Sequence, residues 1–75
     1  MNDRQRRTLE ALKRRVVART CHSRVAEITK ADTDQIGGNA FFHIHAESGI
    51  FKGTAIGYIG PRGGIHMTHE RYDFY

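Results

Sequence analysis

Apolar residues in the first part of the chain recur at intervals of three and four positions: Leu9, Leu12, Val16 and Val17. This spacing places them on one face of an α-helix, and residues 2–22 contain no glycine or proline that would interrupt it. Asn2 followed three positions later by Gln5 is the pattern of a capping box. The pattern predicts one long amphipathic helix over residues 2–22, whose narrow apolar stripe must pack against another element.

The remainder of the chain consists of short runs typical of strands, separated by glycines. The expected strands cover residues 24–31, 40–46, 50–59 and 65–74, with a polar loop over 32–39 and tight turns at 47–49 and 60–64. Short connections favour antiparallel neighbours. The predicted fold is therefore α+β in one domain, 1–75, with the long N-terminal helix packed on a three- or four-stranded antiparallel β-meander.

Alternation along the predicted strands assigns their two faces. Small residues between large ones form a trough on one side of the third strand, where we expect the helix to lie: Phe51, Gly53, Ala55, Gly57 and Ile59. The other side has no second helix to cover it and carries Ile50, Lys52, Thr54, Ile56 and Tyr58. In the second strand His43 and His45 share a side with Phe41. We expect an open sheet face with a hydrophobic patch at Ile56 and Tyr58.

Charge is distributed unevenly along the chain. The first 24 residues hold eight cations against Asp3 and Glu10, whereas the rest is slightly acidic. This asymmetry predicts an electropositive helix face of the kind that binds phosphates or an acidic protein, although a solvated helix surface has the same composition. The candidate cationic contacts are Arg4, Arg6, Arg7, Lys13, Arg14, Arg15, Arg19 and Arg24. The candidate sheet-face or interface residues are His43, His45, Lys52, Ile56, Tyr58, Arg62, Arg71 and Tyr72.

Histidine is frequent, with five residues in 75. His43 and His45, two apart on a strand, have the spacing of a transition-metal pair, but a site needs a third ligand. His66 and His69 lie on opposite faces of a regular strand, so at most one joins the pair unless a bulge intervenes. Because Cys21 is the only cysteine, an intrachain disulfide and a Cys-rich zinc site are excluded. We expect no metal and no cofactor.

Length and hydropathy restrict the setting of the protein. No apolar run approaches a membrane span, and the charged amino terminus lacks the apolar stretch of a signal peptide. These features predict a cytoplasmic protein without membrane contact. A chain of 75 residues with one open sheet face buries little apolar area, so a homodimer or another partner would add burial.

The last seven residues, 69–75, contain His69, Arg71, Tyr72 and Tyr75. This tail resembles the C-terminal strand of the RelE-like ribosome-dependent ribonuclease toxins, which carry a longer chain with two N-terminal helices. The resemblance implies a small metal-independent ribonuclease in which a histidine is the general acid or base and an arginine steadies the phosphate.

We expect a small non-enzymatic protein that acts by occupancy and engages nucleic acid, or a nucleic-acid-handling protein complex, through the basic helix and the open sheet face. In size and plan the chain is similar to phage-encoded inhibitors of bacterial defence complexes, such as anti-CRISPR proteins. That likeness implies the alternative that it binds protein rather than nucleic acid. The ribonuclease toxin is the second alternative.

Overall fold

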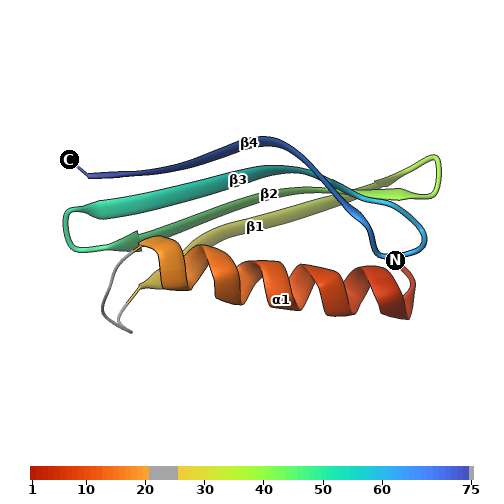
Figure 1. The fold of residues 1–75 in the computed structure, drawn as a ribbon, viewed down its shortest axis with the longest axis horizontal. Helices are drawn as coiled ribbons and strands as arrows, with labels where there is room; N and C mark the ends of the chain where they lie inside the picture. The colour runs from red at the N-terminus through yellow and green to blue at the C-terminus, as the bar shows by residue number, and fades with distance from the viewer. Residues whose placement is uncertain (21–25, 75) are drawn as a thin grey trace.

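The computed structural model describes residues 1–20 and 26–74 and places one helix on one face of a four-stranded sheet (Figure 1). The elements are α1 (Asp3–Thr20), β1 (Glu27–Ile36), β2 (Asn39–Ser48), β3 (Phe51–Ile59) and β4 (Ile65–Phe74). The strands are antiparallel in the order β1-β2-β3-β4, so the predicted α+β meander is confirmed, with all four strands in one sheet. The predicted helix end at 21–22, the strand start at 24–25, and Arg24 and Tyr75 lie outside the described residues.

The core lies between α1 and the two central strands. Leu9, Leu12 and Val16 of α1 pack against a layer of sheet residues that are at most 3% exposed: Ala40, Phe42, Ile44, Ala46, Ala55 and Ile59. The side of β3 predicted to receive the helix is the buried side, apart from Phe51 at its end. Among the described residues, no helix combines the length and apolar character that a membrane crossing requires.

The capping box predicted at the start of α1 is present. The Asn2 Oδ1 accepts a hydrogen bond from the Gln5 backbone N–H at 2.8 Å, and the Gln5 Oε1 accepts one from the Asn2 backbone N–H at 3.0 Å. The buried Gln5 side chain then donates to the carbonyl oxygens of Gly38 (2.8 Å) and Ile59 (3.1 Å). One amide therefore caps the helix and fixes its amino end to the turn after β1 and the end of β3.

The predicted strand over 24–31 is present from Glu27, but its predicted end and the loop predicted over 32–39 were wrong, because β1 continues to Ile36. Gly37 and Gly38, with φ of 58° and 83°, form the two-residue turn that pairs Ile36 with Asn39. This edge strand is almost wholly exposed, so its added residues are mostly polar and show no alternation of apolar and polar positions that would predict a strand. The next turn is also displaced, from 47–49 to Gly49 and Ile50, since Ser48 pairs with Phe51.

Candidate functional site

The predicted site residues divide between two surfaces on opposite sides of the molecule. The candidate cations at positions 4–19 belong to α1, whereas the predicted face of β2 and β3 is the one that α1 does not cover (Figure 1). A flat partner cannot contact both surfaces at once. Arg62 lies in the exposed loop before β4, next to the amino end of α1: the Asn2 Nδ2 donates to the Pro61 carbonyl at 2.8 Å, and the Thr8 hydroxyl donates to that of Gly63 at 3.0 Å.

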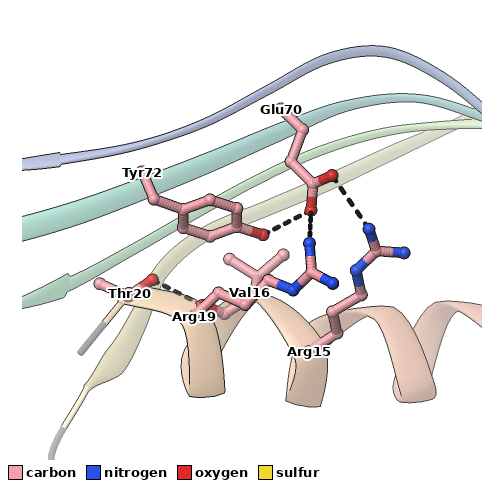
Figure 2. A network of polar contacts seen from close by, with 6 residues as sticks. All are labelled: Arg15, Val16, Arg19, Thr20, Glu70 and Tyr72. Carbon is pink, nitrogen blue, oxygen red and sulfur yellow. Dashed lines mark hydrogen bonds and ion pairs between the residues drawn. The ribbon is translucent and has the colours of Figure 1, made fainter. Parts of the chain in front are cut away.

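Two of the candidate cations form ion pairs with another residue of the protein. Figure 2 shows Arg15 and Arg19 directed toward the carboxylate of Glu70 on β4, at 3.0 and 3.6 Å. Tyr72 donates its hydroxyl hydrogen to the same carboxylate at 2.7 Å. Tyr72, predicted as an interface residue, therefore lies on the helix side of the sheet, where it pairs with Gly53 and packs against the core. This network anchors α1 to β4.

The surroundings of Tyr72 shift the pKa of its phenol. Burial raises its pKa far above the ordinary value, and the hydrogen bond to Glu70 and the charge of that carboxylate raise it further. The neutral phenol is therefore the stable form in the folded protein.

The remaining cations of α1, all exposed except the half-buried Lys13, form a surface that we call the basic face: Arg4, Arg6, Arg7, Lys13 and Arg14. Arg6 pairs with Asp3 at 3.1 Å and Lys13 with Glu10 at 3.3 Å, and such exposed pairs hold their partners weakly. Within residues 1–20 and 26–74, the other three arginines make no ion pair. With seven cations and two carboxylates, α1 carries a formal charge of 7 − 2 = +5.

The open sheet face carries an aromatic row across three strands. Phe41, Tyr58 and His66 are register partners on β2, β3 and β4. The ring centroids of Phe41 and Tyr58 lie 5.2 Å apart, and those of Tyr58 and His66 lie 4.6 Å apart with the planes only 12° from parallel. Ile56 and Tyr58, where the hydrophobic patch was predicted, are half-buried on this face.

A bulge in β4 determines where the last two histidines lie. Ile56 pairs with His69 while Gly57 pairs with Met67, so Thr68 is the extra residue of the bulge. His66 and His69 therefore share the open face, instead of lying on opposite faces as they would on a regular strand. A Cβ on Gly57 would collide with the His66 carbonyl oxygen and lie 3.1 Å from the Met67 Cα, so this glycine admits the bulge.

Next to the aromatic row is a shallow hollow of about 250 Å³. It is lined by His45, Lys52, Thr54, His69, Arg71 and Asp73. The His45 ring is held on both sides, with Nδ1 at 2.9 Å from the Thr54 hydroxyl and Nε2 at 3.2 Å from the Glu47 carboxylate. Arg71 contacts Asp73 through Nη2 at 2.8 Å and Nε at 3.0 Å. The Phe74 backbone N–H and then Arg71 hold the pKa of Asp73 below its ordinary value.

The histidine pair suggested for a metal acquires no third ligand among the described residues. No three His, Cys, Asp or Glu side chains lie where they could hold a metal ion in that part of the chain. His43 shares its register row with Ile56 and His69, and its β1 neighbour is Asp32. His45 is instead committed to Thr54 and Glu47.

Sequence reasoning omitted four residues that contribute to the open face as site residues: Phe41, Thr54, His66 and His69. Alternation already placed Phe41 and Thr54 on this face, so their inclusion needed no further signal. The joint placement of His66 and His69 depends on the bulge opposite Gly57, and a glycine within a strand is the only local sign of it.

Comparisons with protein families, with curated proteins and with solved structures found no match to this chain.

Proposed function

We propose that the protein binds nucleic acid by occupancy and that the basic face of α1 is the surface that contacts phosphates. The observation that carries this proposal is the exposure of Arg4, Arg7 and Arg14 without an ion pair to any described residue. Guanidinium groups offer several N–H donors in a planar fork that fits phosphate oxygens.

The distribution of carboxylates also favours the helix side as the surface that binds phosphates. Glu27, Asp32 and Asp34 lie on β1 with Lys30 as the only cation of that strand, so the acidic edge of the sheet is far along the meander from β4. The loop that contains Arg62 is fixed beside the amino end of α1, where the helix dipole adds positive potential. A polyanion is therefore attracted to the helix side of the molecule, where α1 and the loop that contains Arg62 lie.

Binding assays with single arginine variants test this proposal. Arg7→Gln and Arg14→Gln should each weaken binding to labelled duplex DNA and make the plot of log affinity against log salt shallower by about 0.9, the value for one lost phosphate contact. Both residues lie at exposed positions of α1 without described ion pairs, so the variants should keep wild-type stability.

The matched control is Lys30→Gln, which removes the same charge from β1, where Lys30 lies 3.6 Å from Asp32. Its salt slope should equal that of the wild type. Arg15 and Arg19 are unsuitable for this test because they anchor α1 to Glu70. If the wild-type protein binds no nucleic acid even at low salt, the proposal is wrong and a protein target becomes the working hypothesis.

A further inference from the structure

We infer that α1 enters the major groove of a DNA duplex, where cations on its two flanks contact the phosphates of both strands. This binding mode rests on the nucleic-acid binding proposed above and specifies its substrate class, double-stranded DNA. The buried side of α1 packs on the sheet, and none of the described strands lies on its outer side, so that side can approach a groove (Figure 1).

The cations of α1 surround its outer side instead of forming a single row. Successive residues of an α-helix are turned by about 100°, so Lys13, Arg14 and Arg15 point in three directions that together span about 200°. Arg14 lies nine positions after the buried Gln5, about 180° around the helix, and therefore points away from the sheet. Lys13 and Arg15 lie on the two flanks. A flat polyanion contacts one side of such a helix, whereas a groove with phosphates on both walls contacts both flanks.

Arg4 and Arg6 repeat the two flanks near the amino end of α1. Because they are two positions apart, their side chains are turned by about 200° from each other. Arg4 lies eleven positions, about three turns, before Arg15 and shares its flank, whereas Arg6 lies seven positions, about two turns, before Lys13. Arg4 and Arg6 are both exposed, and Arg15 is paired with Glu70. Each flank therefore presents an exposed arginine to a phosphate.

The outer edge between the flanks carries carboxylates as well as arginines. Asp3 and Glu10, together with Arg6, Arg7 and Arg14, line an open hollow of about 630 Å³. Carboxylates repel the phosphates of a backbone laid against this edge. On the floor of the major groove, however, the amino groups of cytosine and adenine are donors that a carboxylate can accept. A groove therefore offers partners to both signs of charge on α1.

The size of α1 matches the major groove of DNA. Its 18 residues form a rod about 27 Å long and about 10–12 Å wide with side chains. The major groove of B-form DNA is about 12 Å wide and 8.5 Å deep, and it admits an α-helix. The molecule measures only 18 × 16 Å across its two short axes, so the sheet adds little width behind α1. Duplex RNA has a deep, narrow major groove that side chains cannot read, so DNA is the duplex that fits.

Anisotropy titrations with three labelled duplexes of one sequence, each about 16 base pairs long, test this binding mode. The first duplex is DNA, the second is the same DNA with glucosylated 5-hydroxymethylcytosine in place of every cytosine, and the third is RNA. The glucosyl group is uncharged and occupies the major groove, so the phosphates stay as they were. The wild-type protein should bind the modified DNA and the RNA at least about tenfold more weakly than the unmodified DNA.

The variants Arg4→Gln and Arg6→Gln test the two flanks separately. On unmodified DNA each should make the plot of log affinity against log salt shallower by about 0.9, and the double variant by about 1.8, because the two flanks contact different strands at once. A helix laid against one strand would show the change for only one of the two. Lys30→Gln on β1 is the matched control and should keep the wild-type slope. Circular dichroism and thermal unfolding establish that each variant is folded.

The outcomes separate this binding mode from the proposed function. Equal affinity of the wild type for DNA and for either of the other two duplexes overturns binding in the groove, as does a changed salt slope for only one flank variant or for neither. In those cases losses for Arg7→Gln and Arg14→Gln still support the proposed function. If none of the three duplexes binds the wild-type protein even at low salt, the proposed function fails and binding in the groove fails with it.

Discussion

At the scale of single residues, Gly57 has the most demanding position in the sheet. An added Cβ would meet the His66 carbonyl and the Met67 Cα, and backbone atoms cannot rotate away as a side chain can. Gly57→Ala should therefore destabilise the protein by about 1–3 kcal/mol, as overpacking does, measured by urea unfolding. Gly64→Ala is the control, because a Cβ there meets nothing within 4 Å. Equal midpoints for the two variants would refute the packing argument.

Gln5 is a second residue whose role depends on particular atoms. Its side chain caps α1 and donates to two carbonyl oxygens while only 1% exposed. Gln5→Ala removes these bonds and leaves buried acceptors without a donor, so we expect a loss of about 2 kcal/mol in the free energy of unfolding. Gln35→Ala, on the exposed strand β1, should change it by less than about 0.5 kcal/mol. Thermal unfolding of both variants checks the difference.

At the scale of elements, the ion pairs that attach α1 to β4 make two arginines less available to a partner. Glu70 neutralises Arg15 and Arg19 on the side of α1 that faces β4 (Figure 2). Glu70→Gln should release both guanidinium groups, so we expect tighter nucleic-acid binding and a salt slope steeper by about 0.9 for each new phosphate contact. The same substitution should lower the free energy of unfolding by about 1–2 kcal/mol, because Glu70 is only 19% exposed and also accepts the Tyr72 hydroxyl, so the affinities are compared well below the unfolding temperature of the variant.

The control for this element is Asp34→Asn, which removes one negative charge from β1, on the opposite edge of the sheet. It should leave the salt slope unchanged, because it releases no arginine. If Asp34→Asn and Glu70→Gln raise the affinity equally, net charge rather than the release of Arg15 and Arg19 explains the effect.

At the scale of the whole molecule, one helix covers one sheet face and leaves the other to solvent. The two faces have different chemistry: arginines on the outer side of α1, and histidines, aromatic rings and paired charges on the open sheet. The meander places the acidic strand β1 and the strand β4, which carries Arg71 and two histidines beside Glu70 and Asp73, at opposite edges. The two candidate surfaces, the helix side and the open sheet face, therefore adjoin each other at the β4 edge.

The candidate site could be predicted from the sequence only in part. The charge of α1 and the open-face positions of His43, His45 and Tyr58 follow from composition and alternation. Glu70 pairs with Arg15 and Arg19, which lie 55 and 51 positions before it in the chain, and no local sequence pattern predicts such pairs. Likewise, Tyr72 belongs to the helix side because of its register with Gly53, which the tail sequence alone does not reveal.

The sequence by itself determined the helix, its capping box and the faces of the central strands, because these depend on periodicity and on residues within one turn or one strand. Only the tertiary structure decided the length of β1, the bulge at Thr68 and the division of the arginines between internal pairs and solvent. The physical reason is that an edge strand is stabilised by its partner's backbone, and a bulge by the space above a neighbouring glycine. Both are contacts between segments distant in the chain.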